Sequence, residues 1–406
     1  MGFSKLRVAL IGCGMISAVY LKNLKKLDVF DLVGCSDLLP ERARTRAEEY
    51  GIRAMTNEEI FSDPSIDMVI NTTYPLAHYE VARAALLAGK HVYTEKMICE
   101  TNGQAHELLA LAQAKGLFFG GAPDTFLGGG MQMARRLLDS GAIGEPTMLE
   151  AFLARSYRHE RFYTGAEKRF AFCRHGGILF DMGAYYLTGA VFLLGAIREV
   201  TGFTAIRRPD RVYENPNSPL CGKPMTVESP NHATGALRFA GDVLGTLTMT
   251  SECGGGANRF VLYGTDGYID LGDPNHYDAT IRLVGKSGRE SVIETTFGYT
   301  GDNFRAIGAA DAAYAILTGR APRCSGALCC HVLEAALGIA QASATGTAVR
   351  LTGEVGRPAP LAPGYTEYPE LVFRAENASQ KKGKSHETDF AANVHPAGIY
   401  ENPRRF

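Results

Sequence analysis

The chain has 406 residues, of which 46% are hydrophobic and 21% are charged, and its formal net charge is −1. This balance is typical of a globular protein and gives no sign of a nucleic-acid partner or an anionic membrane surface. No apolar run approaches the ~20 residues of a membrane span. The nine cysteines show no C-x-x-C spacing, which is typical of free thiols in a reducing compartment and excludes a cysteine cage for a metal. We therefore expect a cytoplasmic protein that holds no metal.

The first 123 residues alternate short apolar, β-rich runs with helical patterns. Strands are expected at 6–12, 30–37, 66–73, 90–96 and 117–123. Strand–helix alternation at this pitch predicts an α/β fold with a parallel, doubly wound sheet covered by helices on both faces. Residues 1–123 are therefore assigned to one domain.

The pattern changes after residue 123. A helix is expected at 131–139, and mostly alternating strands follow from 198 to 297, before two further helices. Alternation in successive strands predicts an antiparallel sheet with one solvent-exposed face. Residues 124–362 are assigned to an α+β domain with an open, mostly antiparallel sheet, and the polar residues 363–406 to a flexible tail or an arm ordered against another subunit.

The segment GCGMIS (12–17) lies between the first strand and the first helix. Gly12 suits a tight turn, and Gly14 allows close backbone approach to a pyrophosphate. The start of the helix, with Met15 and Ile16, offers free N–H groups. This Gly-x-Gly-x-x-Ser variant of the dinucleotide fingerprint predicts a Rossmann-type NAD(P) site.

Asp37 ends the second strand, 20 residues after Ser17 (37 minus 17). A carboxylate there binds the adenosine ribose diol and repels a 2′-phosphate, which favours NAD over NADP. Asp37 can also cap the helix that begins at Pro40. Arg42 either stacks on the adenine or is solvated.

Further candidates follow the next two strands. Ligands of open α/β sheets bind at the carboxyl edge, so the end of the third strand supplies candidate cofactor contacts: Thr72, Thr73, Tyr74, Pro75 and His78. His78 is either a functional base or a structural group. Lys96 closes the fourth strand, where partial desolvation can move a lysine pKa towards neutrality for proton transfer, with Glu95 holding its ammonium group.

Three motifs in order, GCGMIS, EKM (95–97) and GGILFDMGAY (176–185), resemble those of the Gfo/Idh/MocA oxidoreductases, over about residues 5–350. The resemblance implies a Rossmann domain followed by a domain built on an open sheet, assembled as a homodimer or homotetramer. It also implies that Lys96 is the catalytic lysine and Asp181 its partner acid. Met97 replaces the usual proline. Tyr185 stands where the family usually has a catalytic histidine.

The tyrosine leaves the chemistry open, because histidine titrates near ~6.5 and tyrosine near ~10. In one hypothesis Lys96 takes the proton of a secondary hydroxyl of a sugar, glycoside or cyclitol while hydride passes to NAD, and Tyr185 only hydrogen-bonds the substrate. In the second, Tyr185 removes a C–H proton beside a transient ketone, as in NAD-dependent glycosidases. A non-catalytic NAD-binding regulator is the third alternative. Tyr186 is interpreted as a packing residue.

The segment 155–175 carries six basic residues against two acids and leads into the Asp181 motif. Such a loop suits a carbohydrate with an anionic group, or it is a solvated loop or a subunit contact. Its candidate substrate residues are Tyr157, Arg158, His159, Arg174 and His175. Asp124, between the domains, either reaches the nicotinamide or substrate or caps helix 131–139.

Overall fold

The computed structural model describes residues 5–156, 172–301 and 303–362. Its N-terminal part is a six-stranded parallel sheet of order β3-β2-β1-β4-β5-β6. The strands are β1 (Leu6–Ile11), β2 (Phe30–Ser36), β3 (Arg53–Ala54), β4 (Met68–Asn71), β5 (His91–Thr94) and β6 (Phe119–Gly121). The order reverses between β1 and β4, which opens a crevice at the carboxyl ends of these strands. The predicted doubly wound sheet is confirmed.

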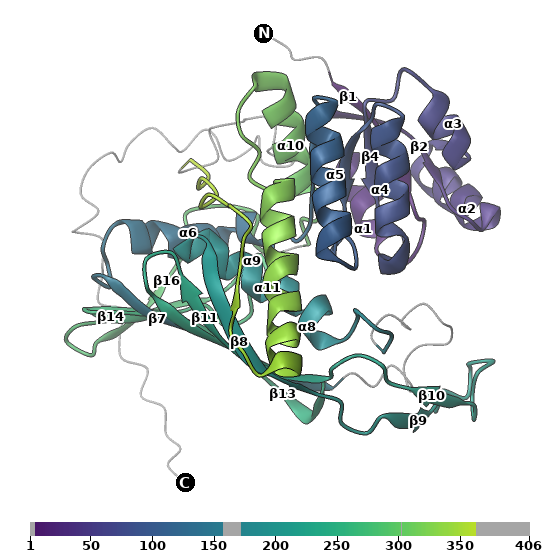
Figure 1. Ribbon diagram of the computed structural model, residues 1–406. Helices are drawn as coiled ribbons and strands as arrows, with labels where there is room; N and C mark the ends of the chain where they lie inside the picture. The colour runs from purple at the N-terminus through teal and green to yellow at the C-terminus, as the bar shows by residue number, and fades with distance from the viewer. Residues whose placement is uncertain (1–4, 157–171, 302, 363–406) are drawn as a thin grey trace.

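Five helices connect these strands: α1 (Ser17–Leu24), α2 (Pro40–Tyr50), α3 (Asn57–Ser62), α4 (His78–Leu87) and α5 (Asn102–Ala114). Figure 1 shows α4 and α5 side by side over one face of the sheet. Capping boxes at Thr56 and Thr101 begin α3 and α5, because each threonine side chain accepts a backbone N–H of the first turn.

The second sheet has nine strands in the order β16-β15-β14-β13-β7-β12-β11-β8-β17. Their bounds are β7 (Pro146–Ser156), β8 (Ile197–Ala205), β11 (His232–Phe239), β12 (Leu244–Thr250), β13 (Glu252–Gly264), β14 (Gly267–Asp270), β15 (Ile281–Gly285), β16 (Glu290–Ile293) and β17 (Val349–Arg350). In this sheet β7 and β12 run parallel, and the other neighbours run antiparallel. Burial alternates residue by residue along β11, so one face of the sheet is buried and the other exposed. The predicted open, mostly antiparallel sheet is confirmed.

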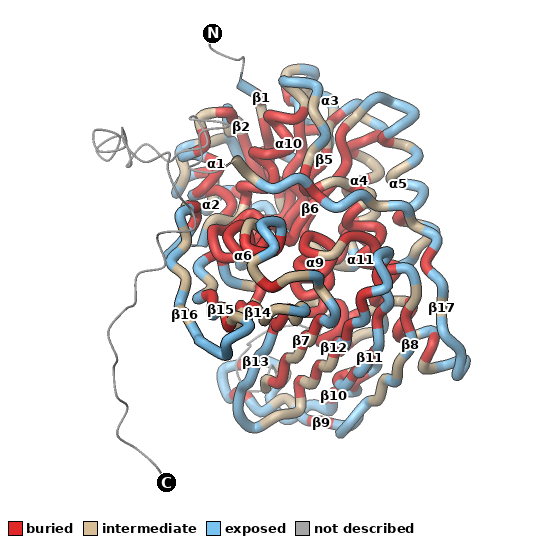
Figure 2. The backbone as a smooth tube through the Cα atoms, turned by 90° about the vertical axis from the view of Figure 1, so that its left-hand side faces the viewer, coloured by how far each residue is buried: buried red, intermediate tan, exposed pale blue. Residues whose placement is uncertain are grey.

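Further helices are α6 (Gly129–Asp139), α8 (Ile178–Asp181), α9 (Gly183–Leu194), α10 (Ile307–Thr318) and α11 (Gly326–Thr345). Helices α8 and α11 pack against the second sheet, and α10 contacts β6 of the first. Figure 2 shows buried backbone along α6, α9 and α11. Helix α9 is buried over nearly its whole length, because apolar or small residues occupy every side of it. Tyr186 of α9 is fully buried and packs edge-on against Phe260 of β13, as interpreted from the sequence.

Helix α11 joins the two parts of the molecule, since it packs against β8 of the second sheet and against α5 and β6 of the first. By length and apolar composition it is a candidate membrane span, but 67% of its most apolar window is buried inside the protein. Just before it, Ser325 forms a β-bridge with Gly120 of β6. The chain after β16 therefore returns to the first domain before β17 completes the second sheet.

Asp311 of α10 is the centre of a buried charge cluster. It is 2% exposed and accepts hydrogen bonds from Arg320 Nη2 (2.5 Å), Arg323 Nη1 (2.7 Å) and the Arg323 backbone N–H (2.7 Å). Arg323 also donates to the carbonyl oxygens of Ala359 and Pro360. Asp311 therefore holds the last described segment of the chain through a buried arginine.

We expect Asp311→Ala to lower the free energy of unfolding by about 3–5 kcal/mol, because it leaves a buried guanidinium without its counter-charge. Urea unfolding followed by circular dichroism measures the change. The exposed ion pair of Asp242 with Arg238 provides the control. Asp242 has φ +58°, a conformation that asparagine also tolerates, so Asp242→Asn is expected to change stability by less than about 0.5 kcal/mol. Equal effects of the two substitutions would contradict the prediction.

Candidate active site

The glycine turn after β1 is packed on one side and open on the other. Gly12 has φ +102°, and a Cβ there would lie 2.5 Å from the backbone nitrogen of Thr73. The Thr72 hydroxyl donates to the carbonyl oxygen of Gly12 at 2.8 Å. At Gly14, by contrast, a Cβ would meet no atom within 4 Å. The turn is thus fixed against the end of β4, with space above Gly14 that fits a pyrophosphate.

Asp37 holds the same turn from the end of β2. Its carboxylate accepts the backbone N–H of Cys13 at 2.7 Å and that of Leu39 at 2.9 Å. The N-cap residue of α2 is Leu39 rather than Asp37, so the acid joins the strand end to the glycine turn. In this position a carboxylate is placed for a ribose diol.

A cleft of about 1060 Å³ runs from this turn to the second domain. The structure brings all the predicted cofactor and catalytic residues to its walls: Gly12, Gly14, Met15, Ile16, Asp37, Arg42, Thr72, Thr73, Tyr74, Pro75, His78, Glu95, Lys96, Asp181 and Tyr185. The sequence reasoning missed Leu38, Asn57 and Arg305, which line it as well. Leu38 is 91% exposed, so its apolar side chain is free to contact a ligand in the cleft. Its position directly after Asp37, the acid at the strand end, could have indicated a contact with the adenine.

Lys96 follows β5 and reaches across to the second domain. Its Nζ forms an ion pair with the Asp181 carboxylate and donates to the Asp181 backbone oxygen at 2.9 Å. Burial alone would lower the pKa of Lys96, but the charge of Asp181, with contributions from Tyr185 and Glu95, outweighs it and raises the pKa above its ordinary value. The expectation of a pKa nearer neutrality is therefore wrong, because the motif does not reveal how close the counter-charge lies.

Glu95 does not hold the ammonium group of Lys96 directly. Its carboxylate accepts the Tyr20 hydroxyl at 2.7 Å and the backbone N–H of Lys96 at 3.1 Å. Glu95 is 8% exposed, so these hydrogen bonds compensate for the burial of its charge. It ties α1 to the end of β5 and steadies the lysine through the backbone.

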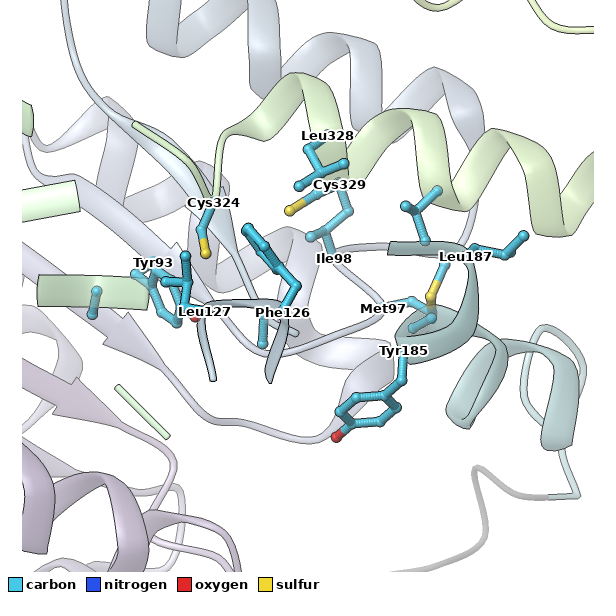
Figure 3. Close-up of a cluster of buried hydrophobic side chains, with 14 of the residues drawn as sticks. Tyr93, Met97, Ile98, Phe126, Leu127, Tyr185, Leu187, Cys324, Leu328 and Cys329 are labelled. Carbon is cyan, nitrogen blue, oxygen red and sulfur yellow. The ribbon is translucent and has the colours of Figure 1, made fainter. Parts of the chain in front are cut away.

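Tyr185 is 6% exposed, and its ring centroid lies 5.2 Å from Lys96 Nζ. Its hydroxyl accepts a hydrogen bond from Arg305 Nη2 at 3.1 Å. In Figure 3, Tyr185 lies at the edge of a buried cluster, below Met97 in this view, with its hydroxyl directed away from the cluster. Arg305 lies 120 residues further along the chain, on a segment without a motif, so sequence spacing could not place it here.

His78 is buried, and both its ring nitrogens already have partners. Nδ1 lies 2.7 Å from the Met97 oxygen, and Nε2 lies 3.1 Å from the Thr73 oxygen. Burial lowers the pKa of His78, although these hydrogen bonds partly oppose the shift. His78 therefore links the loops after β4 and β5, and the structure favours its structural reading over that of a base.

Asp124 is in the interior, and the residues that line the cleft do not include it. It accepts the Tyr277 hydroxyl at 2.6 Å and the backbone N–H groups of Ala306 and Gly308 at 3.1 and 3.0 Å. The expectation of a cofactor or substrate contact needs correction, as does that of a cap on helix 131–139. Asp124 instead holds the start of α10, where three donors compensate for its burial.

The basic segment is described in part. His175 has φ +63° and lines a small pocket of about 20 Å³ together with Lys96 and Asp181. Arg174 is exposed. Tyr157, Arg158 and His159 lie outside the described residues. His175 is thus brought beside the predicted catalytic pair.

Two family models match the chain. Residues 6–120 match the model of the oxidoreductase family with an NAD-binding Rossmann fold, and residues 131–270 match that of the GFO/IDH/MocA C-terminal domain. The chain belongs to the Gfo/Idh/MocA family. This membership confirms the resemblance seen in the motifs and the prediction of NAD as cofactor, which the open space over Gly14 and the position of Asp37 fit.

Among curated relatives, inositol 2-dehydrogenase/D-chiro-inositol 3-dehydrogenase of Lactiplantibacillus plantarum is 28% identical over 36% of this chain and 43% of its own length. Myo-inositol 2-dehydrogenase of Thermotoga maritima is 24% identical over 72% of this chain and 77% of that protein. A solved structure of levoglucosan dehydrogenase with NADH and levoglucosan has a TM-score of 0.76 at 20% identity, over 86% of this chain and 100% of that chain. The match spans less than half the length of the first of these relatives, and the structural likeness shows the fold alone.

We expect Gly14→Ala to weaken NADH binding by about 10-fold or more, because the new methyl group would occupy the space open for the pyrophosphate. Its melting temperature should stay near that of the wild type. Gly12→Ala is the contrasting variant: its Cβ would overlap Thr73 and its backbone is left-handed, so it should lose about 1–3 kcal/mol of stability. Titration calorimetry and thermal unfolding measure the two effects, and unchanged NADH affinity in Gly14→Ala would contradict the assignment.

We expect the protein to lose stability as the pH falls below about 6.5. Burial lowers the folded-state pKa of His78, His91 and His331, so the unfolded chain binds protons first and the folded state is disfavoured. Urea unfolding at pH 7.5 and 5.5 measures the loss. His78→Gln should show a smaller difference in the free energy of unfolding between the two pH values. A difference should remain, because His91 and His331 still contribute. An equal difference in the variant would show that His78 does not contribute.

Proposed function

We propose that this protein is an NAD-dependent oxidoreductase that removes a hydride from a secondary hydroxyl of a sugar, glycoside or cyclitol. The observation that carries the proposal is the ion pair of Lys96 with Asp181, in the same cleft as the glycine turn. When bound, NAD supplies the hydride acceptor. The names of the inositol dehydrogenases among its relatives support the substrate class.

The raised pKa of Lys96 keeps it an ammonium group at neutral pH. As such it can donate a hydrogen bond to the reacting hydroxyl oxygen and stabilise the negative charge that develops there. The hydroxyl proton then passes to Lys96 as Lys96 passes one of its own to the Asp181 carboxylate. In the direction of reduction, Lys96 donates a proton to the carbonyl oxygen.

A redox-neutral glycosidase is the second candidate, because Tyr185 lies between Lys96 and Arg305 in the same cleft. In that scheme Tyr185 removes the C–H proton beside the oxidised carbon, the aglycone leaves, water adds and the ketone is reduced again. In the first scheme Tyr185 only orients the substrate. A regulator that binds NAD without turnover is the third reading.

The substrate, the oligomeric assembly and the cellular location are also part of the proposal. A small carbohydrate is its substrate, and the exposed face of the nine-stranded sheet is the surface for a homodimer or homotetramer. The division of the chain at residue 123, the role of residues 363–406 as a tail or arm, and a cytoplasmic location are predictions from the sequence.

We expect Lys96→Ala to lower turnover by at least about 100-fold under either enzymatic scheme, because the acid/base group is lost. The assay incubates the protein with NAD and a panel of free sugars, cyclitols and aryl glycosides, and follows NADH absorbance and aglycone release. Stoichiometric NADH supports the dehydrogenase, and aglycone release without net NADH supports the glycosidase. Neither signal across the panel would overturn both.

We expect Tyr185→Phe to separate the two enzymatic schemes. For a dehydrogenase it removes one hydrogen bond and should cost less than about 10-fold in turnover, whereas for a glycosidase it removes the base and should cost at least about 100-fold. Tyr186→Phe is the matched control, since it deletes the same atom from the adjacent tyrosine, which packs in the interior.

A further inference from the structure

Arg305 lines the cleft on the segment that leads into α10. Its guanidinium donates three hydrogen bonds: to the Tyr185 hydroxyl at 3.1 Å, to Asn275 Oδ1 at 3.2 Å and to Asn303 Oδ1 at 2.9 Å. A guanidinium has five N–H donors. Five minus three leaves two donors without an acceptor among the described residues.

Within the part of the chain that the structure describes, Arg305 also has no carboxylate in ion-pair contact. All three of its acceptors are neutral, and the ion pairs of the described residues, with N–O distances up to 4.0 Å, include none to Arg305. The two carboxylates near enough to interact with its charge, Glu95 and Asp124, are engaged elsewhere, since they accept the hydroxyls of Tyr20 and Tyr277. Arg305 is half-buried at the wall of the cleft. Arginines that are shielded from water are ordinarily paired with a carboxylate or another anion, and the cleft is the side from which such an anion can reach this one.

The segment that carries Arg305 is held rigidly. Asn23 of α1 donates from Nδ2 to the backbone oxygens of Asn303 and Arg305, both at 2.8 Å. The next residue, Ala306, has φ +90°, a conformation that costs free energy in a residue other than glycine and is maintained only by its surroundings. The buried Asp124 holds its N–H group. The guanidinium therefore does not have to be ordered when a ligand binds, which favours affinity.

We propose that Arg305 binds an anionic substituent, a carboxylate or a sulfonate, on the sugar whose hydroxyl lies at Lys96. This inference rests on the proposed function, because it takes a sugar to occupy this end of the cleft. A guanidinium binds such oxyanions through paired N–H donors. Arg305 contacts Tyr185, whose ring lies against Lys96, whereas the cofactor pyrophosphate belongs at the glycine turn. In this proposal Arg305 binds the anionic substituent, and Lys96 binds the reacting hydroxyl.

The test measures binding and does not require turnover. Calorimetric titrations of the NADH-saturated protein compare D-glucuronate, 6-deoxy-6-sulfo-D-glucose and D-glucose, three probes that differ at one ring substituent. The wild type is expected to bind at least one of the two acids more tightly than glucose. Whichever acid is preferred identifies the oxyanion. Arg305→Gln should weaken binding of that acid by about 10- to 100-fold and leave the affinity for glucose and for NADH unchanged.

Two further variants control for charge and folding. Arg305→Lys keeps the charge without the paired donors and should retain part of the preference. Arg238→Gln removes an arginine that is half exposed on the second sheet and should leave all three sugar affinities unchanged. Thermal unfolding of each variant verifies that it is folded.

Equal binding of the acids and glucose by the wild type, or binding of none of the three, overturns the inference. It is also overturned if Arg305→Gln weakens NADH binding and leaves the preference between sugars intact, because Arg305 would then serve the cofactor. Failure of the proposed function is a separate result, namely that no member of the turnover panel yields NADH or aglycone. An acid-selective, Arg305-dependent binding site in a protein without turnover would support the inference and overturn the enzymatic proposal.

Discussion

The ion pair between Lys96 and Asp181 is the interaction on which the candidate site depends. Lys96 follows a strand of the Rossmann sheet, and Asp181 ends a helix of the second domain, so the pair joins the two domains at the cleft. It also determines the charge of the lysine. Because the carboxylate is so close, Lys96 is held as an ammonium group, suited to stabilising negative charge on oxygen and to exchanging its proton with Asp181.

The residues around this pair are held by buried polar groups that do not line the cleft. Asp124 fixes the start of α10, and Asn23 fixes the backbone that precedes it. Both belong to other parts of the fold, yet together they place Arg305 beside Tyr185. A charged side chain that is ordered before its ligand arrives loses little conformational entropy on binding.

Of the two departures from the family motifs, at 97 and 185, the one that changes the chemistry available to the site is at 185. A histidine there would be a group that titrates near neutrality. Here a tyrosine receives a hydrogen bond from Arg305 and lies against Lys96. The tyrosine therefore changes the groups at the site, since a pair of cations borders one phenol ring.

The sequence by itself determined most of the strand and helix order, the glycine turn and Asp37 at the end of β2, because these features repeat at short spacing or belong to local motifs. It missed the two-residue strand β3, which is too short to show a pattern, and it indicated Lys96 and Asp181 as the candidate catalytic pair through the family resemblance. Period-two and helical patterns are properties of neighbouring residues, and the carboxyl ends of parallel strands necessarily share one edge. Only the tertiary structure revealed the raised pKa of Lys96, the interior position of Asp124, the structural role of His78 and the position of Arg305 at the wall of the cleft. Each of these depends on burial or on a partner brought from far along the chain, and electrostatic and desolvation free energies depend on distances that the order of residues does not contain.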